Sequence, residues 1–206
     1  MKIFMTGGTG FVGTYLAKRF LSEGHSVTIL TANAGEQVLK IKGLSYLEGH
    51  PTLEGEWQKA VAGHDVIINL AGASIFSRWT EKQKNILRSS RMLTTRNLVN
   101  ALPQDASHIT LFSTSAVGYY GFHADEELTE ALPAGTDFLA RLAEDWEREA
   151  LKAQQKDARV IITRFGIVLG KSGGALGQMI PLFKFFLGGP LGSGRQWFSW
   201  IHMHDL

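Results

Sequence analysis

Short runs of β-branched and apolar residues alternate along the chain with longer segments whose apolar residues recur at helical spacing. The short runs predict strands over residues 3–6, 27–30, 44–47, 65–70, 109–113 and 159–165. The longer segments predict helices over residues 11–22, 80–102, where Thr80 is the N-cap, and 137–155. Alternation of strands and helices is typical of a parallel sheet that is covered on both faces. The pattern therefore predicts a doubly wound α/β fold.

A glycine-rich turn follows the first predicted strand and opens the first predicted helix. Gly7, Gly10 and Gly13 stand at intervals of three. In this setting the first glycine permits the tight turn, the second lets the backbone approach a diphosphate, and the third lets helix and strand pack closely. The helix start supplies free N–H groups and a positive dipole. Because the motif stands between a strand and a helix, it predicts a Rossmann-type dinucleotide site rather than a merely structural turn.

The end of the second predicted strand decides which dinucleotide is expected. An NAD site places an Asp or Glu there to hold the ribose 2′-hydroxyl. This chain has Thr31, Ala32 and Asn33 instead, and the nearest acid, Glu36, lies past the strand end. Without that carboxylate a 2′-phosphate is not repelled, so we expect NADP(H), with NAD less favoured. Thr31 and Asn33 can donate to the phosphate, and Lys40 is either a further positive charge or an ordinary loop residue.

Composition narrows the classes of partner. The 206 residues are 44% hydrophobic and 19% charged, which is enough to build a core. The formal net charge is +2 without any block of like charges, so we expect neither a nucleic-acid groove nor a polybasic membrane anchor. The apolar stretch 179–187 is interrupted and too short to cross a bilayer. We expect a cytoplasmic protein that acts on a small molecule.

Cysteine and histidine usage argues against metal and thiol chemistry. Cysteine is absent, which excludes disulfides, thiolate metal sites and a cysteine nucleophile. His202 and His204 form the only close histidine pair, and no third ligand stands at a metal-binding spacing. We therefore expect no metal site.

The texture of the sequence changes after Gly170. Paired glycines and Pro190 interrupt an apolar segment there, whereas residues 1–170 show the regular alternation of strand and helix patterns. We assign residues 1–170 to the nucleotide-binding domain and residues 171–206 to the beginning of a smaller substrate-side region. A strand-like run at 197–201 starts shortly before Leu206, so we expect this region to continue beyond the chain.

Several further motifs carry a family resemblance. They are Asn69-Leu70-Ala71-Gly72, Arg78-Trp79-Thr80-Glu81, the Ser-Thr-Ser-Ala-Val-Gly-Tyr-Tyr-Gly run at 113–121, the Arg-Phe-Gly-Ile-Val-Leu-Gly run at 164–170, and Trp200-Ile201-His202. With the glycine loop, they resemble the extended short-chain dehydrogenase/reductase superfamily in its NAD-dependent epimerase/dehydratase family, and more narrowly its YfcH-type epimerase-like proteins. The resemblance covers essentially the whole chain and implies a longer protein with a C-terminal substrate-side domain.

The resemblance also implies site residues. It places Gly7, Gly10 and Gly13 at the diphosphate, with the helix-start amides of Phe11 and Val12, and places Thr31 and Ala32 at the ribose 2′-position. Strand ends that line the cofactor would contribute Asn69, Leu70, Ala71, Gly72, Ser113, Arg164, Gly166 and Ile167. Ser115 matches the active-site serine or threonine. By analogy alone, the predicted helix at 80–102 leaves a homodimer open.

One departure from the superfamily concerns proton transfer. Its enzymes normally use a Tyr and a Lys at positions i and i+4 of the helix after the serine strand, where the ammonium lowers the phenol pKa. The matching positions here hold Phe138 and Leu142. Arg141 lies on roughly the same face as Phe138, but an Arg stays protonated and is a poor base. The usual dyad is therefore absent.

Tyr119 and Tyr120 remain as candidates for proton transfer because they follow Ser115 in a glycine-flanked loop. Either tyrosine could act beside Ser115, or both could pack the loop structurally. The first hypothesis is an NADP(H)-dependent oxidoreductase or epimerase-like enzyme acting on a hydroxyl or carbonyl carbon of a small molecule, such as a nucleotide sugar. The alternative is a non-catalytic dinucleotide-binding regulatory protein, because some relatives of the resembled group are implicated in cell or plastid division.

Overall fold

The computed structural model describes residues 1–35, 41–171, 173–190 and 192–206. The chain forms two compact units that are both discontinuous in sequence. The first unit contains Met1–Ser115 and Glu144–Thr163, and the second contains Ala116–Ala143 and Arg164–Leu206. The boundary at residue 170 stays a prediction, since it concerns functional domains rather than compactness. No helix in the described ranges has the length and apolar character needed to cross a membrane.

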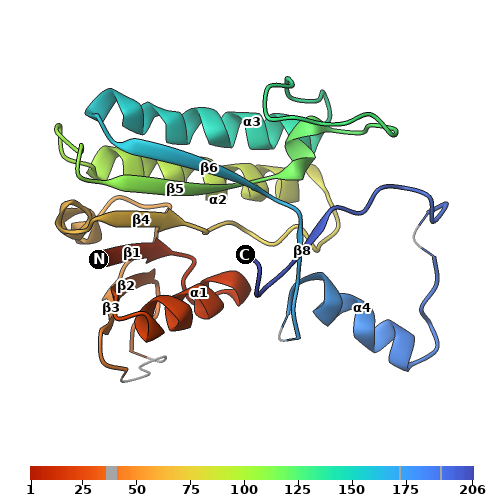
Figure 1. Cartoon of the computed structure of the whole chain (residues 1–206), viewed down its shortest axis with the longest axis horizontal. Helices are drawn as coiled ribbons and strands as arrows, with labels where there is room; N and C mark the ends of the chain where they lie inside the picture. The colour runs from red at the N-terminus through yellow and green to blue at the C-terminus, as the bar shows by residue number, and fades with distance from the viewer. Residues whose placement is uncertain (36–40, 172, 191) are drawn as a thin grey trace. The chain divides into compact units, whose positions relative to one another are not determined.

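The first unit is built on a six-stranded sheet in the order β3-β2-β1-β4-β5-β6 (Figure 1). The strands are β1 Lys2–Thr6, β2 Ser26–Thr31, β3 Leu44–Glu48, β4 Val66–Asn69, β5 Thr110–Ala116 and β6 Arg159–Phe165. The pairs β1–β2, β1–β4, β2–β3 and β4–β5 are parallel. This order reverses at β1 and β4, so it is the doubly wound arrangement, with a topological switch point at the carboxyl ends of those two strands. The predicted fold class is confirmed.

Alternating side chains of the strands feed two separate cores. On one face, Ile3 and Met5 pack with β2 and β4 residues against α1 Phe11–Ser22, which contributes Ala17. Met5 pairs in register with Ile29 and Ile68, so the three side chains stand in one row. Because parallel strands are buried on both sides, their sequences read as nearly continuous apolar runs.

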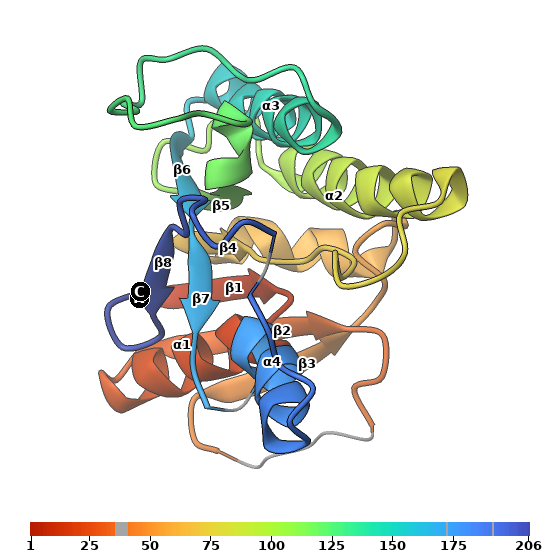
Figure 2. The same cartoon turned by 90° about the vertical axis from the view of Figure 1, so that its right-hand side faces the viewer.

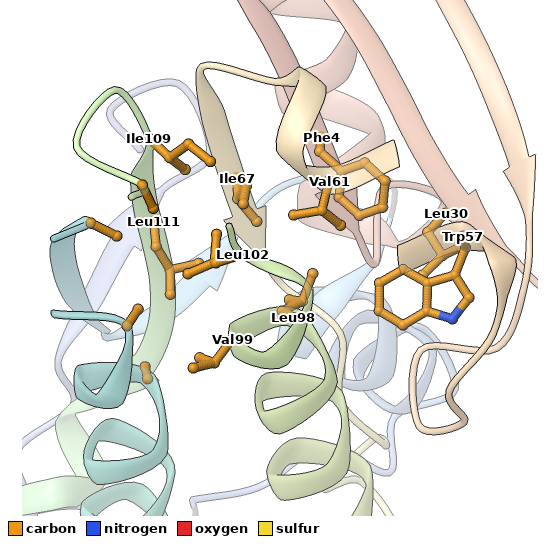
Figure 3. Close-up of a cluster of buried hydrophobic side chains, with 14 residues drawn as sticks. Phe4, Leu30, Trp57, Val61, Ile67, Leu98, Val99, Leu102, Ile109 and Leu111 are labelled. Atoms are coloured by element: carbon orange, nitrogen blue, oxygen red, sulfur yellow. The ribbon is translucent and has the colours of Figure 1, made fainter. Parts of the chain in front are cut away.

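The opposite face packs against α2 Glu81–Ala101, the 3-10 segment η1 Glu56–Gly63 and the end of α3 Phe138–Leu151. Phe4 stacks on Trp57 with ring centroids 6.2 Å apart. Figure 3 shows Leu98 and Val99 of α2 pointing toward this sheet face, with Trp57 beside Leu30. The sheet is therefore held rigidly between two apolar layers, which positions the carboxyl ends of its strands.

The second unit is smaller and rich in turns. It holds the 3-10 turn η2 Val117–Tyr120, the first part of α3, and a two-stranded parallel ladder of β7 Ile167–Leu169 and β8 Trp200–His202 (Figure 2). In the sequence, β7 and β8 are separated by α4 Gly174–Lys184, which contains Pro181. Helix α3 and strand β6 each run from one unit into the other.

Most predicted elements are confirmed to within about two residues. The helices at 11–22 and 81–101 and the strand at 159–165 agree closely, and Thr80 caps α2 by accepting a hydrogen bond from Gln83 N. The predicted helix at 137–155 is an α-helix only to Leu151 and continues as the 3-10 segment η3 Lys152–Lys156. Elements η1, η2, β7 and α4 were not predicted: the first three are short, and glycines and Pro181 interrupt the pattern of α4.

The Leu98→Ala variant should lower the free energy of unfolding by about 3 kcal/mol, because Leu98 is 1% exposed and its loss leaves a cavity between α2 and the sheet. Urea unfolding followed by circular dichroism measures the change. Leu53→Ala is the control: Leu53 is 63% exposed, so its cost should stay below about 1 kcal/mol. Equal losses in the two variants would contradict the packing described for α2.

Candidate functional site

The glycine loop joins β1 to α1 at the switch point of the sheet. Gly7 has a φ of +69°, a conformation that favours glycine, and its carbonyl accepts a hydrogen bond of 3.0 Å from Gly10 N. A Cβ on Gly13 would collide with the carbonyl oxygen of Gly7. The loop can therefore fold back on the first turn of α1 only because these positions lack side chains.

The start of α1 is open to an anion. Gly10 is the N-cap, no side chain caps the helix, and its first turn contains no acidic residue. Gly10 is exposed, while Phe11 and Val12 are half-buried. The N–H groups of the first helical turn have no partners within the helix and concentrate its positive dipole. These features fit the diphosphate of a dinucleotide, as the sequence predicts for the three glycines and the two helix-start residues.

The loop also touches the end of β4. A Cβ on Gly7 would lie 2.8 Å from the carbonyl carbon of Leu70 and 2.9 Å from the nitrogen of Ala71. The structure thus brings the predicted diphosphate loop and the predicted cofactor-lining residues together in one place. Leu70 and Ala71 are half-buried, and Gly72 is exposed.

The end of β2 holds the residues predicted to contact the 2′-position of the adenosine ribose. Thr31 is half-buried, Ala32 and Asn33 are exposed, and Asn33 N donates to Thr31 Oγ1 over 3.4 Å. The register pairs Thr31 with Glu48 of β3, an exposed acid that sequence reasoning missed because it lies on another strand. Paired residues of parallel strands project from the same face of the sheet. Lys40, the predicted extra charge, lies outside the described residues.

Asn69 and Ser113 point their side chains into the protein. Asn69 is fully buried: Thr6 Oγ1 donates to its Oδ1 over 2.8 Å, and its Nδ2 donates to Thr95 Oγ1 over 2.9 Å and to Ser113 Oγ over 3.4 Å. Trp146 Nε1 also donates to Thr95 Oγ1. The network ties the three strands β1, β4 and β5 to the helices α2 and α3. At these two positions, therefore, the backbone rather than the side chain remains for the predicted cofactor contacts.

Ser115 is buried and paired with an acid. It is 2% exposed, and its Oγ donates to Oε1 of Glu147 on α3 over 2.6 Å. Sequence reasoning missed Glu147, although a signal existed. Ala140, Ala143, Glu147 and Ala150 recur at the three- and four-residue spacing of one helix face, and the three alanines are all buried. A carboxylate at such a position requires a hydrogen-bond partner, which Ser115 supplies.

In the second unit, Arg164 organises both candidate tyrosines. Its Nη1 donates to the Tyr120 hydroxyl over 2.8 Å, and its Cζ lies 3.5 Å from the ring centroid of Tyr119. The two tyrosine rings meet edge to face with centroids 5.4 Å apart. Tyr120 is buried and Tyr119 is half-buried. This cluster pairs a phenol with a permanent cation, although α3 contains neither Tyr nor Lys.

The remaining predicted positions of the second unit lie on its small ladder. A Cβ on Gly166 would lie 2.8 Å from the carbonyl oxygen of Ser199, and Ile167 N donates to that same oxygen over 2.8 Å. Gly166 thus lets the two segments approach before β7 and β8 pair. Within the part of the chain that the structure describes, no group of three or more His, Asp or Glu side chains is arranged to hold a metal ion.

Comparison with known proteins places this geometry in a family. Residues 3–206 match the profile of the NAD dependent epimerase/dehydratase family. The chain is 43% identical to the chloroplastic "Epimerase family protein SDR39U1 homolog" of Arabidopsis thaliana, over all of this chain and 60% of that protein. It is 42% identical to "Epimerase family protein YfhF" of Bacillus subtilis, over 100% of this chain and 67% of that protein.

A solved structure agrees with this match. The human epimerase family protein SDR39U1 (isoform 2), crystallised with NADPH, superposes with a TM-score of 0.80 at 33% identity, over 100% of this chain and 67% of that one. The chain thus spans about three fifths to two thirds of the length of these relatives. The resemblance inferred from the sequence motifs is confirmed.

The loop beside the tyrosines contains a titratable pair that gives a pH prediction. His123 Nδ1 lies 2.6 Å from Glu126 Oε1, and its Nε2 lies 2.9 Å from the Tyr120 carbonyl oxygen, so both nitrogens face acceptors. The hydrogen bond to Glu126 raises the pKa of His123, and the same bond lowers the pKa of Glu126. By linkage, the pair stabilises the loop between the two shifted pKa values. That contribution is lost as the pH rises through the His123 pKa or falls through the Glu126 pKa.

An NMR titration of the His123 ring should therefore give a pKa above the ordinary value of about 6.5. Glu126→Gln should lower that pKa, whereas Glu127→Gln should leave it unchanged. A His123 pKa at its ordinary value in the unmodified chain would show that the pair does not form in solution.

Proposed function

Because the chain belongs to the NAD dependent epimerase/dehydratase family, we propose that it is an NADP(H)-dependent oxidoreductase or epimerase-like enzyme. It acts on a hydroxyl or carbonyl carbon of a small molecule, with nucleotide sugars as the first class to test. The observation that carries the proposal is the glycine loop, whose backbone closes on itself and on the end of β4 while the start of α1 stays uncapped. That geometry suits a diphosphate bridge.

The chain's own residues hold and orient the cofactor. The helix-start amides after Gly10 bind the diphosphate, Thr31 and Asn33 meet the adenosine ribose, and the backbone at 69–72 lines the path toward the nicotinamide. When bound, the nicotinamide ring supplies or accepts a hydride. We prefer NADP(H) because no acid directly follows β2 before residue 36 and because the human relative was solved with NADPH. Glu48, paired with Thr31, is the feature that would favour NAD.

Proton transfer needs a group other than the missing dyad. Tyr120 is the best candidate: its oxygen accepts from Arg164, so its own O–H remains to be donated to a substrate oxygen. The guanidinium also fixes the position of the phenol oxygen. Tyr119, stacked under Arg164, contributes to the shape of this cluster.

The hydrogen bond of Ser115 restricts what that residue does. Its proton is committed to Glu147, so its oxygen is available as an acceptor only. In this role Ser115 receives a hydrogen bond from a substrate hydroxyl and does not polarise a carbonyl. An alcohol is therefore the form of substrate that the serine suits best.

A regulatory protein that binds the dinucleotide without turnover is the second candidate. Two observations favour it: α3 lacks both Tyr and Lys, and Ser115 is only 2% exposed. Both candidates bind the dinucleotide at the glycine loop. They differ in whether a hydride is transferred to or from its nicotinamide ring.

We also propose that a second copy of the chain packs on α2 and the end of α3. A groove of about 510 Å³ runs between these helices and is lined by Asn85, Arg88, Ser89, Met92, Leu93, Arg96, Asp145, Arg148, Glu149 and Lys152. Ile86 and Leu93 expose apolar surface on α2. Their burial in a homodimer would remove that surface from water.

The Gly10→Glu variant tests the cofactor site. Its backbone fits an ordinary residue, its Cβ would meet only the Gly7 carbonyl oxygen at 3.2 Å, and an acid at a helix start does not destabilise folding. The carboxylate should repel the diphosphate and weaken NADPH binding at least about 100-fold by calorimetry. Gly63→Glu, on open surface away from the loop, should bind like the unmodified chain. Absence of NADPH and NADH binding by the unmodified chain would refute the proposal.

The same preparations separate the two candidate functions. Loss of NADPH absorbance is followed with a panel of sugar nucleotides and simple carbonyls, and NADP⁺ reduction with the matching alcohols. Epimerisation returns the hydride to the substrate and leaves the cofactor absorbance unchanged, so it is followed by NMR of the sugar nucleotides. The enzyme proposal expects turnover that Gly10→Glu abolishes. Tight NADPH binding without hydride transfer across the whole panel would favour the regulatory protein.

Leu93→Lys tests the homodimer. Sedimentation should give twice the chain mass for the unmodified protein, and a charge placed in the groove should weaken self-association at least about tenfold. Leu53→Lys, at a position that is 63% exposed elsewhere on the surface, should not change the mass. A monomer at all concentrations of the unmodified chain would rule the interface out.

A further inference from the structure

Arg91 is a half-buried cation without a carboxylate partner among the described residues. It stands in the middle of α2, and burial lowers its pKa. Arg88 and Arg96, a turn away on the same helix, are each paired with an acid, Asp145 at 2.6 Å and Glu149 at 3.0 Å. Buried charges in proteins are ordinarily paired. Arg91 is therefore the arginine of α2 whose charge the fold leaves uncompensated.

The hydrogen bonds of Arg91 use one side of the guanidinium. Nη1 donates to the carbonyl oxygens of Ala73 over 3.2 Å and Leu87 over 3.1 Å. The flat face of the group lies over Trp146, with Cζ 5.2 Å from the ring centroid. In the described chain, no hydrogen bond involves Nε or Nη2. Their N–H groups form the fork that binds carboxylates and phosphates in a bidentate manner.

The guanidinium lies at the strand end that meets the glycine loop. A Cβ on Gly72 would lie 3.1 Å from Cζ of Arg91, and Gly7 packs against Leu70 and Ala71 immediately before it. Ser90 Oγ accepts a hydrogen bond from Ala73 N. The adjacent residues Ser90 and Arg91 of α2 therefore bond both the N–H and the carbonyl group of Ala73. Ligands of open α/β sheets bind outside the carboxyl ends of the strands at the switch point, where this segment lies.

We infer that Arg91 is an oxyanion-binding residue, which receives a carboxylate or phosphate group of the ligand bound at the carboxyl end of β4. The oxyanion comes from the substrate or from the cofactor diphosphate. The inference rests on the proposed function for the identity of that ligand, whereas the oxyanion chemistry rests on the geometry of Arg91 alone. Gly72 belongs to the same site, because a Cβ there would press on the guanidinium, at 3.1 Å from Cζ of Arg91.

A purely structural role explains less of the geometry. Holding the loop at residue 73 needs one neutral donor and one acceptor, and Ser90 already provides the acceptor. A permanent charge adds a desolvation cost that such a clamp does not require. A bound anion offsets the desolvation cost of the Arg91 charge. Stacking on Trp146 keeps the guanidinium oriented while no anion is bound.

The experiment titrates inorganic phosphate into the chain, with and without saturating NADPH, by calorimetry and by the NMR signal of the Arg91 Nε–H. The titration without NADPH is repeated in the Gly10→Glu background, so that phosphate bound at the glycine loop is not counted. Arg91→Met should weaken phosphate binding at least tenfold, and Arg91→Lys should weaken it less, since it keeps the charge but loses the fork. Gly72→Ala should also weaken it, although the charge remains. Arg19→Met, on the exposed last turn of α1, is the matched control.

The outcomes distinguish the source of the oxyanion. Phosphate binding that depends on Arg91 and persists with NADPH bound assigns the site to the substrate. A tenfold loss of NADPH affinity in Arg91→Met assigns it to the cofactor diphosphate. If the unmodified chain binds no dinucleotide, the proposed function is wrong. The present inference still holds in that case, provided that phosphate binds through Arg91 in the Gly10→Glu background. If Arg91→Met changes neither phosphate nor NADPH binding, or if it lowers only the melting temperature, Arg91 is structural and the inference is wrong.

Discussion

Direct backbone contact at the glycine loop governs how the start of α1 and the end of β4 come together. The loop touches the first turn of α1 through Gly13 and the end of β4 through Gly7, and in both places a single Cβ would collide with main-chain atoms. Such contacts bring unpaired N–H groups of a helix start to the switch point of the sheet. The strand ends can serve one common ligand only because this approach is so close.

Buried polar groups make the carboxyl ends of the strands near the glycine loop rigid. Asn69 joins β1, β4 and α2, and Ser115 joins β5 to α3 through Glu147. A buried network of this kind is stable only when each member has a partner, so it fixes the positions of the strand ends. Arg91 differs from these groups: its protein hydrogen bonds leave half of its fork unused. Asn69 therefore belongs to the scaffold, whereas Arg91 keeps N–H groups available to a ligand.

Sequence reasoning succeeded where the signal is local. The spacing of Gly7, Gly10 and Gly13 and the Thr80 cap depend on neighbours a few residues away, so they could be recognised directly. It failed for Glu147, Glu48 and Arg91, whose roles depend on segments distant in the chain. Helix α4 was missed for a different reason: glycines and Pro181 hid a helical segment whose local propensity is poor.

The main strands and helices up to residue 165, the cofactor loop and the absence of the Tyr–Lys dyad could be read from the sequence, because periodicity and motif spacing are properties of neighbouring residues. Which side chains turn inward, and which acid or cation each one meets, depends on the folded chain. Asn69 and Ser113 look alike as strand-end polar residues, yet both are consumed by internal hydrogen bonds. Partners such as Glu147 for Ser115 and Arg164 for Tyr120 stand 32 and 44 residues away. Only the folded chain brings them within bonding distance.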